Sequence, residues 1–520
     1  MDYRRDTEIQ QAQTRDRKRR QKTHARQAQA GDSADTHILQ TQLKQYAEWG
    51  LYPFHMPGHK RLMQPAPDLP AGWDVTEVPG TDDLHDADGI LLQAMRRTAR
   101  LCGADRTWYL VNGSTCGLLA GIRALAPMGA EVICARNCHK AVYHAIELSG
   151  YRVHWIMPPV DEEWGICGGI STDQIRSAIR KHPSARAVIL TSPTYEGVLS
   201  EIAGICEICH KRGIPVLVDE AHGAHLIPAS VSAGFPAGAL AAGADLTVQS
   251  PHKTLPSLTQ TALLHLRGHL VDPERVEQEL DIFETSSPSY LLMASLDGCT
   301  GILRESGEEL FGNWADRIGR FDALVREKLK RIRILGRTEP SFSSGLCDPG
   351  KILIDASPLG MKGTRMASIL RDQYRMETEM AQGGLVLVMT SICDEEDALD
   401  RLARALIEME SAAGSKAEED QEPCASSPKN YIRQLSDLRP TAACTISEAA
   451  GQESETVPLT LARGRVCAEY LYFYPPGIPV AAPGEIITGK LAALLEQARR
   501  DGALLYRHSE DRTAIRCLRE

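Results

Sequence analysis

The sequence predicts an α/β fold organised around a mostly parallel β-sheet, followed by a smaller α/β unit and a C-terminal domain. Two observations carry this prediction. Apolar runs of strand length alternate with helical patterns from about residue 90 to residue 270. Strands that alternate with helices form parallel sheets covered on both faces. In such sheets ligands bind beyond the carboxyl ends of the strands.

The expected strands of this sheet are six apolar runs: EVICA (131–135), RVHWIM (152–157), AVILTS (187–192), PVLVD (215–219), DLTVQS (245–250) and TALLHL (261–266). Helical patterns lie between most of them, such as GLLAGIRAL (117–125), AVYHAIELSG (141–150) and SEIAGICEICHKRG (200–213). A long helical stretch at about 272–333 leaves this domain. We expect the strands to form one sheet with helices on its faces.

The pattern divides the chain into five segments. They are a polar, basic and disordered tail (1–36), a large domain with its N-terminal segment (37–333), a small α/β domain (334–411), a linker (412–428) and a C-terminal domain (429–520). The small domain contains the apolar strands KILIDAS and GLVLVMTSI with helices near 363–373 and 394–411. The C-terminal segment contains the strand EYLYFY and a final helix. The linker lacks periodicity, which is typical of a mobile connection.

The composition is that of an ordinary globular protein, with 43% hydrophobic and 24% charged residues in a chain of 520. The net charge of −10 argues against a nucleic-acid partner for the chain as a whole. No apolar run is long enough to cross a membrane. The 14 cysteines are scattered, which predicts a reduced, cytoplasmic protein.

One cysteine pair requires a separate interpretation. Cys206, Cys209 and His210 match the pattern of c-type haem attachment. The pattern lies at the end of an amphipathic helix in a chain without an export signal. We therefore expect these cysteines to be ordinary buried helix residues.

A lysine and an acid follow two of the expected strands. Lys253, in the segment SPHKT (250–254), comes directly after DLTVQS and can condense with an aldehyde to form a Schiff base. Asp219 ends the strand PVLVD and can keep the pyridine nitrogen of pyridoxal phosphate (PLP) protonated. Residues 219–222 also spell a helicase DEAH box, but the sequence contains no Walker A loop. Alone, Lys253 would more often be a solvated surface residue.

Three further segments lie at strand ends. Ser114 and Thr115 begin a helical pattern after WYLV (108–111), where a helix N-terminus can bind a phosphate or carry a simple cap. His139 follows EVICA and could stack on a pyridine ring or merely cap a helix. The segment 191–197 follows AVIL and could line the same crevice. Each signal is weak alone, but their common position at strand ends favours one PLP site.

These motifs resemble the Orn/Lys/Arg decarboxylase family of fold-type I PLP enzymes, in particular its shorter members without an N-terminal wing domain. The resemblance rests on PFHMPGHK (53–60), GTDDLHDADG (80–89), NGSTCG (112–117), NCHKA (137–141), SPTYEG (192–197), VDEAHGAH (218–225), SPHKTL (250–255), TSSPSY (285–290) and PPGIPVAAPGE (475–485). It implies a fold-type I architecture, PLP as the cofactor and a homodimer or larger homo-oligomer with shared active sites.

The resemblance also implies residue roles. Lys253 resembles the lysine that bonds PLP, Asp219 the partner of the pyridine nitrogen, and His139 the histidine that stacks on the ring. His222 stands where some members have a tryptophan. The phosphate ligands are implied to be Ser114, Thr115, Ser250 and His252, with Ser286 contacting the phosphate of a second subunit.

The implied reaction is decarboxylation of a basic amino acid, arginine, lysine or ornithine, to carbon dioxide and a polyamine-type amine, as in polyamine biosynthesis. A carboxylate should recognise the distal cation. The candidates are Glu284, Glu377, Glu379, Glu469 and Glu485. Two alternatives stay open: another fold-type I reaction such as transamination, and a catalytically silent regulatory homologue.

Overall fold

The computed structural model describes residues 52–54, 76–77, 81–228, 230–338, 346–414, 438, 440–473, 478–500, 505–506 and 513–520. The tail predicted at 1–36 and residues 415–428 of the predicted linker lie outside this set. Of the predicted loop 53–60, only Pro53 and Phe54 are described. They belong to a short strand, β1 (Tyr52–Phe54), which pairs in parallel with β13 (Met376–Thr378).

Seven strands form the central sheet in the order β2-β10-β9-β8-β7-β3-β4. Their bounds are β2 (Arg106–Leu110), β3 (Glu131–Ala135), β4 (Arg152–Ile156), β7 (Val188–Thr191), β8 (Val216–Glu220), β9 (Leu246–Gln249) and β10 (Ala262–Leu266). The strands from β9 to β4 pair in parallel. Among these seven strands, β10 alone runs in the opposite direction, so its pairings with β2 and β9 are antiparallel. The predicted α/β fold with a mostly parallel sheet is therefore confirmed.

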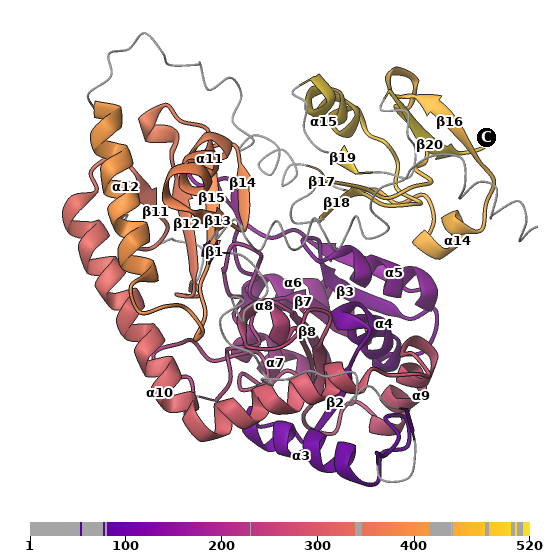
Figure 1. Cartoon of the computed structure of the whole chain (residues 1–520). Coiled ribbons are helices and arrows are strands. Elements are labelled where there is room, and N and C mark those ends of the chain that lie inside the picture. The colour runs from indigo at the N-terminus through magenta and orange to yellow at the C-terminus, as the bar shows by residue number, and fades with distance from the viewer. Residues whose placement is uncertain are drawn as a thin grey trace, which may run out of the picture. The chain divides into compact units, whose positions relative to one another are not determined.

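Helices pack against this sheet (Figure 1). Their bounds are α3 (Ile90–Cys102), α4 (Gly113–Leu125), α5 (Lys140–Ser149), α6 (Thr172–Lys181), α7 (Ile202–His210), α8 (Pro251–Thr254) and α9 (Pro273–Phe283). A two-stranded hairpin, β5 (Val160–Asp161) and β6 (Ile166–Cys167), precedes α6. The sequence produces this arrangement because helices such as α3, α4 and α6 present an apolar stripe to strands that are themselves buried, whereas α9 packs on α4.

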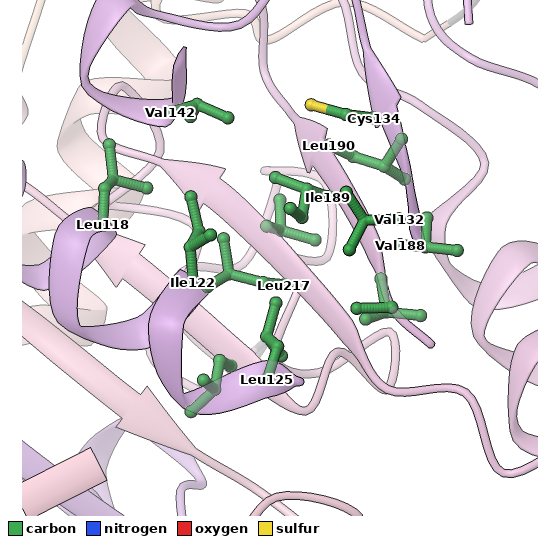
Figure 2. Close-up of a cluster of buried hydrophobic side chains, with 14 of the residues drawn as sticks. Leu118, Ile122, Leu125, Val132, Cys134, Val142, Val188, Ile189, Leu190 and Leu217 are labelled. Carbon is green, nitrogen blue, oxygen red and sulfur yellow. The ribbon is translucent and has the colours of Figure 1, made fainter. Parts of the chain in front are cut away.

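Helix α4 shows how the apolar pattern places an element against the sheet. Leu118, Ile122 and Leu125 recur at helical spacing and lie toward Leu217 of β8 in Figure 2. Gly117 lies on the sheet side of the same helix, where an added Cβ would come within 2.6 Å of Leu110 Cδ1. A side chain there would push the helix away from the sheet, and with it the residues at its N-terminus.

A ladder of polar side chains crosses four strands of the sheet. Glu220 Oε2 accepts a hydrogen bond of 2.8 Å from the amide of Gln249, whose oxygen lies 3.1 Å from His265 Nε2. The other ring nitrogen of His265 lies 2.8 Å from Thr107 Oγ1. All four side chains are buried. Burial in this apolar sheet raises the pKa of Glu220 to about 8, although the hydrogen bonds from Ala239 N and Gln249 oppose the rise.

A second α/β unit follows the long helix α10 (Tyr290–Lys328), whose 39 residues pack against α3 and β2 of the central domain and against α12 (Ala398–Gly414) of the second unit (Figure 1). Its sheet has the order β11-β12-β15-β14. The remaining bounds are β11 (Arg333–Ile334), β12 (Lys351–Asp355), η2 (Ser357–Leu359), α11 (Gly363–Tyr374), β14 (Met380–Gln382) and β15 (Leu385–Met389). The predicted strands KILIDAS and GLVLVMTSI correspond to β12 and β15.

The C-terminal segment contains two small sheets, β16-β20 and β18-β17-β19. Its elements are α14 (Ile446–Ala450), β16 (Ser454–Pro458), η4 (Leu459–Leu461), β17 (Leu471–Phe473), β18 (Ile478–Ala481), α15 (Gly489–Arg500), β19 (Leu505–Tyr506) and β20 (Ala514–Leu518). The expected final helix is α15, but β19 and β20 follow it. A buried ion pair joins this segment to the central domain, with Arg136 Nη1 and Nη2 at 2.6 and 2.9 Å from the carboxylate of Glu485.

The cysteines of the haem-like pattern lie on α7. Cys206 and Cys209 are buried in the core of the central domain, and His210 Nε2 lies 2.8 Å from Asp245 Oδ2. The prediction of ordinary buried helix cysteines is thus confirmed. Among the helices of the described ranges, none is both long and apolar enough to span a membrane.

Candidate active site

A cavity of about 320 Å³ lies at the carboxyl ends of β3, β7, β8 and β9. Seven of the nine predicted site residues line it: Ser114, Thr115, His139, Asp219, His222, His252 and Lys253. A larger cavity of about 830 Å³ lies along β4 and contains none of the nine. The chemistry therefore points to the smaller cavity, because ionisable side chains from five separate segments converge there.

Lys253 lies on α8, the single turn that follows β9. Desolvation lowers the pKa of Lys253 below its usual 10.5, whereas the charges of Asp219 and Glu379 oppose this change. A lysine amine attacks a carbonyl carbon only in its neutral form, so the lowered pKa favours this chemistry. Lys253 Nζ lies 3.1 Å from His222 Nε2.

Asp219 is the fourth residue of β8 and is buried. Its Oδ1 accepts a hydrogen bond of 3.2 Å from Ala221 N. Burial raises the pKa of this carboxyl, and the charge of Lys253 and the Ala221 N–H oppose the rise. A cationic group placed beside Asp219 would favour its ionised form further.

His139 combines the two roles that the sequence left open. It is the N-cap of α5, where its Nδ1 accepts a hydrogen bond of 3.2 Å from Ala141 N, and its ring also lines the cavity. Burial, with the positive charges of Lys253 and Lys140, lowers the pKa of His139 to about 4. The ring is therefore neutral near pH 7, with its proton on Nε2, since Nδ1 is the acceptor.

His222 lies between two lysines, one of which the sequence analysis missed. Its Nδ1 lies 2.9 Å from Nζ of Lys351, the first residue of β12. Lys351 is 4% exposed, and burial lowers its pKa to about 8. A lysine that begins an apolar strand gives no signal of such a contact, because most lysines at strand ends are solvated.

The predicted phosphate ligands occupy the N-terminal turn of α4 and the turn before Lys253. Ser114 and Thr115 begin α4 directly after Gly113, whose φ of +76° strongly favours glycine. Ser250 is the N-cap of α8 and is fully buried, but it does not line the cavity. His252 Nδ1 lies 2.8 Å from the carbonyl oxygen of Thr261.

Ser286 and four of the five candidate glutamates do not line the cavity. Ser286 is exposed in the connection between α9 and α10. Glu485 is paired with Arg136, Glu377 with Arg371, and Glu284 accepts a hydrogen bond from Cys116 Sγ, whereas Glu469 Oε1 accepts one from Arg516 N. Glu379 does line the cavity, and its Oε1 accepts a hydrogen bond of 2.8 Å from Tyr195 Oη.

Comparison with protein families identifies this architecture. The Orn/Lys/Arg decarboxylase major domain matches residues 38–341, and the C-terminal domain of the same family matches residues 426–502. The chain belongs to the Orn/Lys/Arg decarboxylase family. Membership confirms three predictions: the family, PLP as the cofactor, and decarboxylation of a basic amino acid as the class of reaction.

Relatives of this decarboxylase extend over most of its length. An arginine decarboxylase of Halalkalibacterium halodurans is 34% identical and covers 86% of this chain and 90% of its own. An arginine decarboxylase of Bacillus subtilis is 33% identical, over 93% of this chain and 98% of its own. Among solved structures, a lysine decarboxylase of Francisella novicida superimposes with a TM-score of 0.72 at 18% identity, over 90% of this chain and 81% of that one. That likeness shows the fold.

The polar atoms around the cavity fit the cofactor of the family. Three are buried without a hydrogen-bond partner in the described part of the chain: Asn137 Oδ1, Thr191 Oγ1 and Ser250 Oγ. Buried polar atoms of this kind are usually satisfied by a ligand or water. Asn137 and Thr191 line the cavity together with the N-terminal turn of α4, which favours a phosphate, and with Asp219, which favours a cationic ring nitrogen. The donor set thus matches the phosphate and the pyridine ring of PLP.

Proposed function

We propose that this decarboxylase acts on arginine and that the cavity around Lys253 is its active site. The observation that carries the site assignment is the convergence of Ser114, His139, Asp219 and Lys253 on one cavity from four strand ends. The substrate is inferred from the relatives, because those at 30% to 34% identity that match most of the chain include three named arginine decarboxylase. Relatives named lysine decarboxylase match about half of the chain at 25% to 28% identity.

Each residue has a distinct task in this proposal. Lys253 would bond the cofactor through its amine and would yield that position to the α-amine of the substrate. Asp219 would hold a proton on the ring nitrogen, and the neutral ring of His139 would restrict the motion of the pyridine ring. When bound, PLP supplies an electron sink for the pair released as carbon dioxide leaves. Asp219 strengthens that sink because its charge is fixed before the reaction begins.

The α-carbon must receive a proton after carbon dioxide has left. Lys253 and His222 are the candidate donors, because both line the cavity and their nitrogens lie 3.1 Å apart. His222 has a pKa far below its usual value, since it is desolvated and faces Lys253 and Lys351. Lys253 is therefore the better donor at neutral pH.

Glu379 is the best candidate to bind the guanidinium group of the substrate. It is the one member of the five candidate glutamates that lines the cavity, and Tyr195 Oη fixes its carboxylate. A planar guanidinium can donate two parallel hydrogen bonds to a carboxylate, which makes this pairing strong and directional. In this proposal Glu379 replaces part of the hydration that arginine loses on binding.

Three further proposals concern the cellular setting. The enzyme is a homodimer or larger homo-oligomer in which Ser286 of the partner subunit contacts the phosphate, as its exposure in one chain permits. It works in the cytoplasm, as the scattered cysteines suggest. Its amine product enters polyamine biosynthesis. The domain boundaries predicted from the sequence also remain proposals.

A direct assay tests the function. The purified full chain, loaded with PLP, is incubated separately with arginine, lysine and ornithine, and carbon dioxide and the amine products are measured. We expect equal amounts of carbon dioxide and decarboxylated arginine, and a higher kcat/KM for arginine than for the other two. Keto-acid formation without carbon dioxide would support transamination, and no turnover with any of the three would support a silent homologue.

A second experiment tests the site. Borohydride reduction of the PLP-loaded protein followed by peptide mapping should place the cofactor adduct on Lys253, and Lys253→Ala should form no adduct there and lose turnover. An adduct on another lysine would refute the assignment.

A further inference from the structure

Lys351 is a buried lysine behind the cavity, in contact with the cavity residue His222, and the proposed reaction gives it no task. It reaches His222 from one side while Lys253 reaches it from the other, at 2.9 Å from Nδ1 and 3.1 Å from Nε2. Lys253 comes from the central sheet and Lys351 from β12 of the second sheet. One imidazole therefore connects two amines that belong to different parts of the fold.

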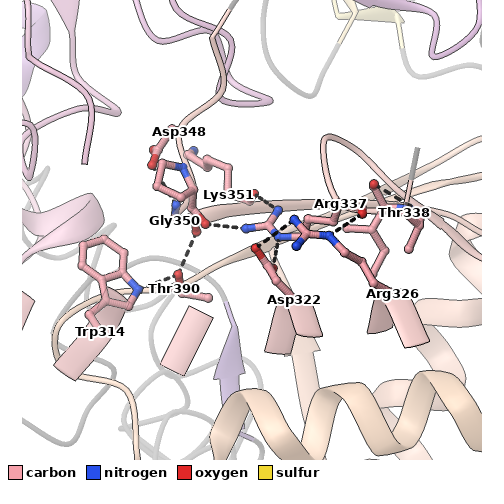
Figure 3. Close-up of polar contacts among 11 residues, drawn as sticks. Trp314, Asp322, Arg326, Arg337, Thr338, Asp348, Gly350, Lys351 and Thr390 are labelled. Carbon is pink, nitrogen blue, oxygen red and sulfur yellow. Dashed lines mark hydrogen bonds and ion pairs between the residues drawn. The ribbon is translucent and has the colours of Figure 1, made fainter. Parts of the chain in front are cut away.

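The backbone that carries Lys351 is held firmly, as Figure 3 shows. Arg337 Nη1 donates to the carbonyl oxygen of Lys351 at 3.0 Å, and the Gly350 carbonyl oxygen accepts from Thr390 Oγ1 at 2.9 Å. The stem of Lys351 packs so closely against Gly197 that an added Cβ would lie 2.8 Å from its Cβ and Cγ. The amine thus has little freedom to leave His222.

The number of available protons restricts the charge of the two amines. An ammonium group can only donate hydrogen bonds, and a neutral imidazole has one donor and one acceptor nitrogen. His222 is neutral near pH 7, because its pKa lies well below 6.5. If both lysines were ammonium groups, one of them would point a donor at the N–H of His222. One of the two amines must therefore accept a hydrogen bond, and only a neutral amine can do so.

The surroundings of the two lysines decide which one is neutral. Lys351 Nζ also donates to the carbonyl oxygen of Tyr195 at 3.2 Å, so it already acts as a hydrogen-bond donor in this cluster. The acidic groups that favour its charge are Asp348, Glu379 and Glu196, and the opposing charge is Lys253. Lys253 faces two acids, Asp219 and Glu379. His222 itself also faces His139 and His252. Lys351 is the better donor, which leaves the proton of His222 on Nε2.

We propose that Lys351 is a positioning residue that fixes the tautomer of His222, so that Nε2–H donates to Lys253 and keeps its amine neutral in the PLP-free protein. The inference rests on the proposed role of Lys253. Lys351 touches neither the reacting carbon nor the cofactor in this scheme. Lys351 instead raises the neutral fraction of the Lys253 amine. Only the neutral amine can bond to PLP, both at first capture and at the end of each turnover.

The test measures PLP capture rather than turnover. PLP-free full-length protein is mixed with PLP, and the growth of the visible absorbance band of the PLP–lysine linkage is followed across pH. Wild-type capture should accelerate with pH as the neutral fraction of Lys253 grows. In Lys351→Met a cation is lost and His222 can turn its lone pair toward Lys253. Both changes favour the ammonium form, so the midpoint should rise by about one pH unit and capture at pH 7 should slow about tenfold.

Three further variants separate positioning from a structural effect. Lys351→Arg keeps the charge and the donors and should keep the wild-type midpoint. His222→Phe should raise the midpoint as Lys351→Met does, and adding Lys351→Met to it should give a smaller further shift than Lys351→Met gives alone, because only the loss of the cation remains. Lys140→Met removes a cation that faces His139 and is not among the charges that act on His222, so it should leave the midpoint unchanged.

The outcomes distinguish this inference from the proposed function. A wild-type midpoint in folded Lys351→Met, or an equal further shift when it is added to His222→Phe, overturns the inference. If Lys351→Met does not fold by circular dichroism, a wild-type midpoint in His222→Phe overturns it instead. Peptide mapping after borohydride reduction accompanies each measurement. An adduct away from Lys253 refutes the proposed function, whereas an adduct on Lys253 with unmoved midpoints refutes only the role of Lys351.

Discussion

Replacing Glu220 by Gln should make the protein more stable at alkaline pH but not at acid pH. Glu220 is 1% exposed, and its carboxyl has a pKa of about 8 instead of the usual 4.5. Below pH 4.5 the carboxyl is protonated in both the folded and the unfolded chain, and no penalty arises. Between pH 4.5 and pH 8 the unfolded chain releases the proton while the folded chain retains it, so stability falls as pH rises.

The size of this effect follows from the same two values. One pKa unit corresponds to about 1.36 kcal/mol, so a rise from 4.5 to about 8 predicts a loss of about 4 to 5 kcal/mol above pH 8. Glutamine cannot ionise and escapes this loss. Its amide also fits the ladder, because Gln249 and His265 can exchange donor and acceptor atoms by an amide flip and a change of tautomer.

The assay compares denaturant unfolding of the PLP-loaded wild type and Glu220→Gln at pH 5 and pH 8.5. The difference in free energy of unfolding between the two proteins should grow by about 4 kcal/mol over this range. Glu207→Gln is the matched control, since Glu207 is exposed on α7 and its pKa is lowered by Lys211. Its difference from wild type should stay constant above pH 5. An equally constant difference for Glu220→Gln would show that the carboxyl is already ionised in the folded protein at pH 5.

Three other substitutions test separate parts of the argument. Glu379→Gln should lower kcat/KM for arginine about 10- to 100-fold, the value of one charge-assisted hydrogen bond, and unchanged kinetics would remove Glu379 from substrate binding. Arg136→Met should lower the free energy of unfolding by about 3 to 5 kcal/mol, because it leaves the buried Glu485 carboxylate without its cation. The double variant Arg136→Met with Glu485→Gln should recover part of this loss in the same unfolding assay. Gly197→Ala should raise the pH midpoint of PLP capture, since its Cβ would displace Lys351, whereas Gly213→Ala, with a comparable positive φ and open space around it, should leave that midpoint unmoved.

The convergence of most predicted site residues on one cavity could be predicted because it depends on one local rule. His139, Asp219 and Lys253 each end or follow an apolar run, and the carboxyl ends of parallel strands meet at one edge of the sheet. The order of the strands in the sheet did not have to be known. The antiparallel direction of β10 did not affect the prediction either, because β10 contributes no predicted site residue.

The contacts of Lys351 could not be predicted in this way. Its position beside His222 depends on how β12 and the loop before it pack against the central domain, through Gly197 and Arg337. Nothing local to the segment KILIDAS encodes those distant partners. The strands β19 and β20 were missed for a simpler reason: β19 has only two residues, and the five residues of β20 include the exposed Arg516. Short strands of mixed polarity lack the periodicity on which sequence prediction depends.

The pair Asp219 and Glu220 shows how one strand places adjacent acids in different surroundings. Successive residues of a strand point to opposite faces, so Asp219 lines the cavity while Glu220 joins the polar ladder. Burial raises the pKa of both carboxyls, but the charge of Lys253 opposes the rise for Asp219, whereas the charge of Asp219 adds to the rise for Glu220. A shift of one residue in β8 would move the Asp219 carboxyl to the face of the polar ladder, away from Lys253 and from the position proposed for the ring nitrogen. The register of β8 against β7 and β9 is therefore a requirement of the chemistry as well as of the fold.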